Sequence, residues 1–114
     1  MSDSEQELDP AEVDRRMRED GWAVIDVREG AEVEAGHIAA SRHVAIAELS
    51  AEAETIDRDR PVVFVCRSGS RSGMAAEAFR QAGWDAYNLR GGLLAWVEAE
   101  LPLEPEDGQV ISQA

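Results

Sequence analysis

The segment that most constrains the fold is the apolar run at residues 62–65, which follows Pro61 and ends at Cys66. It consists of β-branched and aromatic side chains, with no alternation between apolar and polar positions. Runs of this kind are buried on both faces and are typical of a central strand in a parallel sheet. We therefore expect residues 62–65 to form the central strand of an α/β protein.

Strands and helices alternate along the rest of the chain. Asp9-Pro10 places an N-cap carboxylate before a proline at the first helical position, and Gly21 is expected to end that helix. Residues 28–41 are expected to be irregular. The other predicted elements are strands at 23–27, 43–44 and 86–89 and helices around 49–56, 74–82 and 93–101. This alternation predicts a central, mostly parallel sheet with helices on both faces.

The length of 114 residues fits one domain. We expect that domain at residues 8–101, between a flexible acidic N-terminus at 1–7 and a loosely ordered C-terminal tail at 102–114. No apolar run approaches the ~20 residues of a membrane helix, and the polar, acidic start does not fit a secretory signal. The sequence thus predicts a cytoplasmic protein that does not interact with membranes.

The charge balance is strongly acidic. The net charge is −13, from 24 acidic and 11 basic residues, and every basic residue is arginine. Such a surface repels phosphate, so we expect no nucleic-acid partner. Two explanations for the lysine-free composition stay open. The acidic surface could serve solubility alone, or the protein could be halophilic and work in molar salt, where charges are screened over about 3 Å. The second explanation predicts unfolding in low salt.

Chemistry is predicted at Cys66, because ligand sites in parallel sheets lie beyond the carboxyl ends of the strands. The six residues that follow it are small, polar or cationic. They are Arg67, Ser68, Gly69, Ser70, Arg71 and Ser72. A tight turn into a helix directs backbone N–H groups at a common centre, and the helix dipole and arginines favour thiolate over thiol. An inert core cysteine would have no use for these neighbours. We expect an activated thiolate in an anion-binding loop.

Other site types fit the sequence less well. A phosphate loop of the Walker kind needs a lysine, which the chain lacks. One cysteine permits no internal disulfide and no thiolate-rich metal site, and His37 and His43 alone are a weak metal signal. We expect neither a metal nor a cofactor.

Four segments of the chain resemble the single-domain rhodanese-like sulfurtransferase family. They are Asp26-Val27-Arg28-Glu29, Glu34-Ala35-Gly36-His37-Ile38, the loop at 66–72, and Gly83-Trp84 with Leu89-Arg90-Gly91-Gly92-Leu93-Leu94-Ala95-Trp96. They occur in the family's order and cover about residues 8–101. One departure is visible at residues 40–45, where the family often has Gly-Ala-x-Asn-Ile-Pro; it affects the shape of that loop. The resemblance implies a single rhodanese-like domain.

The length of the loop separates two chemistries found among relatives of this fold. Cys66 and Arg71 form a Cys-x4-Arg pattern. Relatives that are cysteine phosphatases or arsenate reductases resemble one another in a loop one residue longer, and Ser72 stands where their arginine would be. A larger loop fits a tetrahedral oxyanion, whereas a tighter one fits a single extra sulfur atom. The shorter loop therefore favours sulfur transfer.

The resemblance implies a double displacement through a persulfide on Cys66. The thiolate attacks a small-molecule sulfur donor such as thiosulfate, and residues 67–72 hold the persulfide. Cyanide, a small thiol or a protein thiol then accepts the sulfur. Arg67 and Arg71 are expected to stabilise the incoming dianion.

Asp26 and Arg28 are expected to support this site. Asp26 resembles the family's loop-organising carboxylate, and Arg28 could either line the loop or pair with Glu29 or Glu34. Two other functions stay open, a persulfide carrier that serves a protein partner and a rhodanese-like binding module without catalysis.

Overall fold

The computed structural model describes residues 3–112. Within that range, one sheet has the strand order β1-β5-β4-β2-β3, and all neighbouring strands are parallel. The strands are β1 (Glu7–Leu8), β2 (Ala23–Asp26), β3 (Arg42–His43), β4 (Val62–Val65) and β5 (Ala86–Leu89). The predicted parallel sheet is confirmed, and the run at 62–65 is its middle strand.

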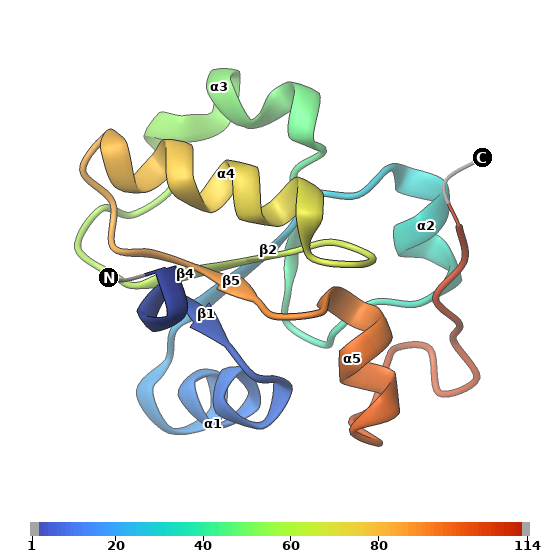
Figure 1. Ribbon diagram of the computed structural model, residues 1–114. Helices are drawn as coiled ribbons and strands as arrows, with labels where there is room; N and C mark the ends of the chain where they lie inside the picture. Colours follow the sequence, from blue (N-terminus) through green and yellow to red (C-terminus); the bar gives the residue numbers. More distant parts are fainter. Residues whose placement is uncertain (1–2, 113–114) are drawn as a thin grey trace.

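Helices cover both faces of the sheet (Figure 1). The helices α4 (Ser70–Gln81) and α3 (Leu49–Glu52) lie over one face, and α1 (Pro10–Asp20) and α5 (Gly92–Glu98) lie over the other. The remaining elements are α2 (Gly30–Ala35) and the 3-10 turns η1 (Asp3–Gln6), η2 (Ile46–Glu48) and η3 (Ala53–Thr55). Among residues 3–112, no helix combines the length and the apolar character needed to cross a membrane.

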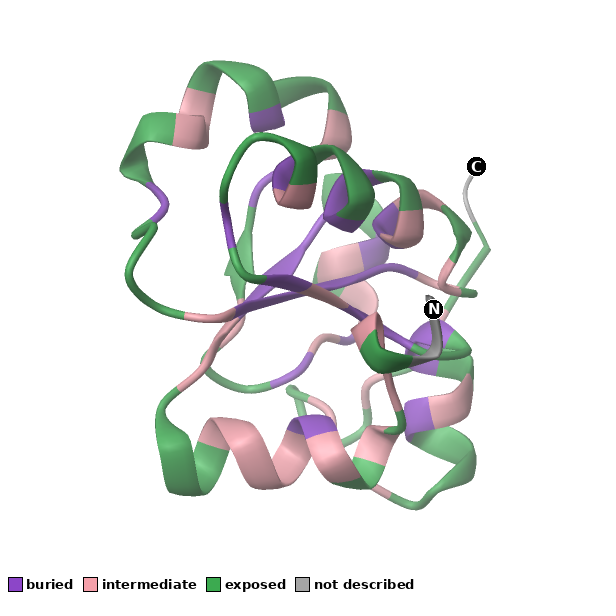
Figure 2. Ribbon diagram, turned by 60° about the vertical axis from the view of Figure 1, so that its left-hand side comes forward, coloured by how far each residue is buried: buried purple, intermediate pink, exposed green. Residues whose placement is uncertain are grey.

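The sheet separates two hydrophobic clusters. Its three inner strands, β5, β4 and β2, are largely buried, while the helices expose their outer faces (Figure 2). Side chains of a strand point alternately to its two faces. Accordingly, Val62 and Phe64 pack into one cluster, and Val63 and Val65 pack into the other. All four are fully buried, which explains why β4 has no polar position in its sequence.

The first long helix has the predicted limits. It begins at Pro10 and ends before Gly21, which adopts the left-handed conformation with φ of 69°. Asp9 occupies the N-cap position, but its side chain makes no capping hydrogen bond. Its carboxylate instead lies 3.2 Å from the guanidinium of Arg90, just after β5.

The segment at 28–41, which was expected to be irregular, contains α2, and this prediction was wrong. The helix starts with a capping box, in which the Glu29 and Glu32 side chains each accept a hydrogen bond from the other residue's backbone N–H. It is six residues long and begins with a glycine, so it is too short to show helical periodicity.

Several residues near the two ends of the chain make specific contacts. Glu7 and Leu8 pair with β5. Glu104, in the tail, exchanges two backbone hydrogen bonds with His37, with N···O distances of 2.9 and 2.7 Å. Leu103 and Val110 pack against the hydrophobic cluster on the α1 side. In Figure 1 the tail runs beside α2. Residues 1–2 and 113–114 lie outside the described range, and the domain limits at 8 and 101 stay predictions.

Candidate active site

Cys66 lies at the carboxyl end of β4, and its side chain is fully buried. The chain then turns at Gly69, whose φ of 98° suits a residue without a Cβ, and α4 begins at Ser70. The Sγ atom accepts hydrogen bonds from the Gly69 and Ser72 backbone N–H groups, with N···S distances of 3.1 and 3.4 Å. The Ser72 Oγ lies 3.3 Å from the same sulfur. The two backbone donors stabilise negative charge on the sulfur.

Hydrogen bonds from the start of α5 hold the backbone of the Cys66 loop in place. The Leu93 and Leu94 N–H groups donate to the carbonyls of Cys66 and Arg67, with N···O distances of 2.8 and 3.1 Å. Gly92 permits this close approach because a Cβ there would collide with the Arg67 carbonyl. Its φ of 64° also favours glycine. Gly92 thus lets α5 pack against the loop, where the N–H groups of α5 bind two loop carbonyls.

Arg71 is engaged by a carboxylate of α2. Its two terminal nitrogens lie 3.0 Å from the two Glu32 oxygens, and Glu32 is 1% exposed. Burial alone would raise the pKa of Glu32, but hydrogen bonds from Arg71 and from the Glu29 N–H outweigh it and leave the pKa below its ordinary 4.5. The hydrogen bond to Glu32 raises the pKa of Arg71. The pair therefore ties α2 to the loop and offsets the arginine's charge.

Arg67 differs from Arg71 in its contacts. It forms no ion pair with any residue in the described range, and its Nε–H is buried without a hydrogen-bond partner there. A buried N–H donor without a partner costs free energy, so it is a group that a bound anion would satisfy. The other loop hydroxyls, those of Ser68 and Ser70, belong to exposed residues.

Asp26 and Arg28 form a fully buried ion pair, with a nitrogen–oxygen distance of 2.7 Å. The Arg28 guanidinium also donates to the carbonyls of Glu32 and Gly36, with N···O distances of 3.3 and 2.7 Å. Arg28 thus pairs with Asp26 and with neither of the two glutamates predicted from the sequence. These contacts join the end of β2 to the first turn and to the C-cap of α2. The pair supports the segment that presents Glu32 to Arg71.

A second set of polar groups leads away from the sulfur. The Ser72 Oγ lies 2.6 Å from Asn88 Oδ1, and the Asn88 Nδ2 donates to the Gly69 carbonyl at 3.0 Å. The same nitrogen donates to the Glu7 carboxylate, with N···O distances of 3.0 and 3.1 Å. The sequence did not indicate Glu7, Glu32 or Asn88 as site residues. The available signal was one polar residue, Asn88, near the end of an otherwise buried strand.

The model of the rhodanese-like domain matches residues 9–99. The chain belongs to the rhodanese-like family. A relative from Pseudomonas aeruginosa, named thiosulfate sulfurtransferase GlpE, is 38% identical over 113 residues, which span 96% of this chain and 98% of the relative. A protein from Allochromatium vinosum named sulfurtransferase is 32% identical over 104 residues, or 90% of this chain and 97% of that protein.

A solved structure shares the fold of this rhodanese-like chain. The crystal structure of a rhodanese-related protein from Thermoplasma volcanium has a TM-score of 0.81 and 30% identity. The match covers 86% of this chain and 96% of that protein. The resemblance identified from the four sequence segments is therefore confirmed over nearly the whole chain.

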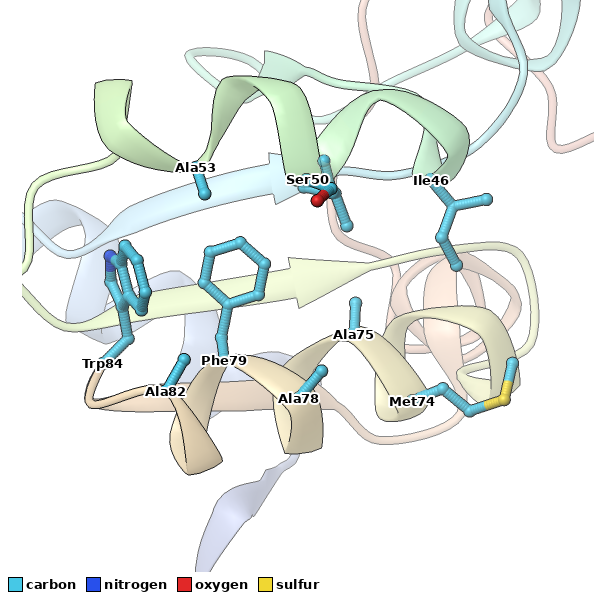
Figure 3. A pocket seen from close by; sticks show the side chains of 10 residues that line it. Ile46, Ser50, Ala53, Met74, Ala75, Ala78, Phe79, Ala82 and Trp84 are labelled. Carbon is cyan, nitrogen blue, oxygen red and sulfur yellow. The ribbon is translucent and has the colours of Figure 1, made fainter.

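An apolar groove runs along α4 on the side of the rhodanese domain that faces α3 (Figure 3). It has a volume of about 410 Å³, and Ile46 and Ala53 face Ala75 and Phe79 across it. Met74, in the second turn of α4, lies at one end of the groove and is 64% exposed. The groove does not include Cys66 among its lining residues, so the sulfur and the apolar surface are separate features.

Proposed function

We propose that this chain is a rhodanese-type sulfurtransferase that moves sulfane sulfur from a donor such as thiosulfate to a nucleophilic acceptor. The observation that carries the proposal is the setting of Cys66, the chain's one cysteine. Its sulfur lies at the N-terminus of a 12-residue helix and accepts two backbone N–H hydrogen bonds. The Pseudomonas aeruginosa relative, similar over almost the full length, is named a thiosulfate sulfurtransferase.

In the first step, the Cys66 thiolate attacks the outer sulfur of thiosulfate. A new sulfur–sulfur bond forms, the donor's own sulfur–sulfur bond breaks, and sulfite leaves with the electron pair. The Gly69 and Ser72 N–H groups hold the charge on Sγ before the attack. Since Cys66 is fully buried, a small opening of the loop must admit the donor's outer sulfur.

Arg67 is the better placed of the two loop arginines to bind the donor dianion. Arg71 already forms an ion pair and two hydrogen bonds with Glu32. The buried Arg67 Nε–H, in contrast, lacks a hydrogen-bond partner among residues 3–112. A charge-assisted hydrogen bond from Arg67 to the leaving sulfite would strengthen as charge develops there. In this proposal, Arg71 shapes the loop and Arg67 binds the anion.

In the second step, an external nucleophile takes the outer sulfur. The acceptor attacks that sulfur, the bond to Sγ breaks, and Cys66 leaves as a thiolate into the same N–H donors. Because the chain has one cysteine, no thiol of its own can resolve the persulfide. Cyanide, a small thiol or a protein thiol has the required chemistry.

Steady-state kinetics tests the proposal. With thiosulfate and cyanide as substrates, the protein should form thiocyanate with the parallel-line pattern of a ping-pong reaction. Cys66→Ser should abolish the activity. Arg60→Gln, at an exposed arginine that donates to the Gly21 carbonyl, should leave it unchanged. Thiocyanate formation by the Cys66→Ser protein would overturn the assignment.

A persulfide carrier is the second candidate, and the groove along α4 favours it. Because α4 begins at the Cys66 loop, a protein acceptor that packs against Met74 and the groove would bring its thiol near the persulfide. Met74→Glu tests this function. It should slow discharge to a protein thiol and leave discharge to cyanide unchanged. If Met74→Glu discharged to the protein thiol as fast as the parent does, the carrier function would be contradicted.

A further inference from the structure

The Ser72 hydroxyl has one proton and two acceptors within reach. One is Asn88 Oδ1 at 2.6 Å, and the other is Cys66 Sγ at 3.3 Å. A full hydrogen bond to both at once is impossible, because a hydroxyl donates a single proton. The shorter contact belongs to the amide oxygen. In the resting site the proton therefore lies on the side of Asn88, and the hydroxyl turns its lone pairs toward the sulfur.

The orientation of the Asn88 amide is fixed by its other partners. Its Nδ2 lies within hydrogen-bond distance of two acceptors, the Gly69 carbonyl and the Glu7 carboxylate. An amide NH2 group satisfies both, whereas an amide oxygen in that place would face only acceptors. The Oδ1 must therefore face Ser72, and it can only accept. The amide thus draws the Ser72 proton away from the sulfur.

Glu7 strengthens the hydrogen bond from Ser72 to Asn88. Both of its oxygens lie close to Asn88 Nδ2, so the contact is charge-assisted. A charge-assisted bond on the nitrogen polarises the amide and makes its oxygen a better acceptor, because hydrogen bonds in a chain reinforce one another. These groups come from β1, β5 and α4 and meet Cys66 just after β4, so the chain of contacts exists only in the folded protein.

We propose that Asn88 and Glu7 are positioning residues that limit the thiolate population of Cys66 by competing with its sulfur for the Ser72 proton. The inference rests on the proposed function only in taking Cys66 as the reacting group. When the sulfur is a thiol, its S–H can donate to the Ser72 oxygen. When it is a thiolate, the hydroxyl must either leave Asn88 or present lone pairs to a negative sulfur. Each choice costs free energy, and weakening the Glu7 contact should reduce that cost.

Other charges also act on this sulfur, and the experiment must hold them constant. Arg67 and Arg71 are positive, Arg71 is paired with Glu32, and the Asp26–Arg28 pair lies at the end of the adjacent strand β2. None of these groups changes in the variants below. Asp9 provides a matched control, because it is a carboxylate near Glu7 that pairs with Arg90 rather than with Asn88. Asp9→Asn removes the same charge as Glu7→Gln without touching the chain of contacts.

The test is the rate of alkylation by iodoacetamide against pH, followed by the mass of the intact protein. Cys66 is the one cysteine, so the reaction reports on this sulfur alone and needs no sulfur donor. The midpoint of each rate profile is compared, since a change in access alters the plateau but not the midpoint. Glu7→Gln should move the midpoint to lower pH by about half a unit, the size expected of an indirect hydrogen-bond contact. Asp9→Asn should move it less.

Ser72→Ala cuts the chain of contacts and completes a double-mutant cycle. In the Ser72→Ala background, Glu7→Gln should shift the midpoint of the alkylation profile no more than Asp9→Asn does. Ser72→Ala alone should not raise the midpoint, because its hydroxyl proton is committed to Asn88. Equal shifts from Glu7→Gln in both backgrounds, or a higher midpoint in Ser72→Ala, would overturn the proposal. Either result would leave the sulfurtransferase assignment standing, since alkylation requires only a reactive Cys66.

Discussion

The groups that touch the sulfur and the groups that hold them in place come from different parts of the chain. The two backbone N–H groups that donate to Sγ, those of Gly69 and Ser72, lie in the loop after β4 and in the first turn of α4. The supporting groups, Glu7, Glu32, Asn88 and Gly92, come from four other elements. The comparison teaches that a short local sequence builds the nucleophile, whereas tertiary contacts set the loop's shape, charge and proton positions. Each part can be perturbed separately.

The largest effect on the supporting part is expected from Gly92→Ala. The new Cβ would collide with the Arg67 carbonyl, and the positive φ adds strain, so the free energy of unfolding should fall by about 3 kcal/mol and activity should fall with it. Gly21→Ala is the matched control. Its φ of 69° is similar, but nothing lies within 4 Å of the added Cβ, so about 1 kcal/mol is expected. Urea unfolding gives both values. Equal losses would show that the close approach of α5 is unimportant.

Glu32→Gln removes the ion pair between α2 and Arg71 and leaves the groups that donate to the sulfur in place. Near neutral pH the variant should lose about 2 kcal/mol of stability, because the buried carboxylate and its charge-assisted bonds to Arg71 are lost. The pKa of Glu32 is below 4.5 in the folded protein, so its contribution is complete above that pH and disappears as the pH falls through the lowered pKa. The stability difference between parent and variant should therefore vanish in acid. A difference that does not shrink as the pH falls below 4.5 would contradict this explanation.

Arg67→Gln affects the local part of the site. Loss of the proposed contact to the donor should raise the KM for thiosulfate about tenfold, because a charge-assisted hydrogen bond is removed. The KM for cyanide should change little, and so should stability, since Arg67 has no ion-pair partner among the described residues. An unchanged KM for thiosulfate would show that Arg67 does not bind the donor, and Arg71 would then be the candidate for anion binding.

The acidic surface acts on the stability of the whole molecule and is expected to affect the chemistry of the site least. If the net charge of −13 reflects adaptation to molar salt, raising the salt concentration should raise the midpoint of thermal unfolding by at least about 5 °C as self-repulsion is screened. Full stability in low salt would favour the other explanation, solubility alone. Thermal unfolding followed by circular dichroism across a salt series measures this.

The predictability of each region follows from how local its determinants are. The strand at 62–65 and the helix that starts at Pro10 were predicted with the limits found, because buried runs, proline and glycine act within a few residues. The helix at 30–35 was missed, since six residues give no periodicity. The strand at 7–8 was missed because two residues paired through their backbone leave no pattern.

The same rule applies to the site. Cys66 and its loop were recognisable because the arginines, serines and glycine lie side by side in the sequence. The partner of Arg71 could not be inferred, since Glu32 is 39 residues away and belongs to the missed helix. Asn88 and Glu7 are separated by 81 residues and meet only when β1 joins the sheet.

The central claim is that Cys66 carries the transferred sulfur, and the mass of the intact protein tests it most directly. The protein is incubated with thiosulfate in high salt and weighed, with Cys66→Ala treated in parallel. A species one sulfur atom heavier, absent in the variant and reversed by cyanide, is the predicted result. No added mass on the parent protein with thiosulfate or with persulfide donors, or the same added mass on Cys66→Ala, would contradict the account.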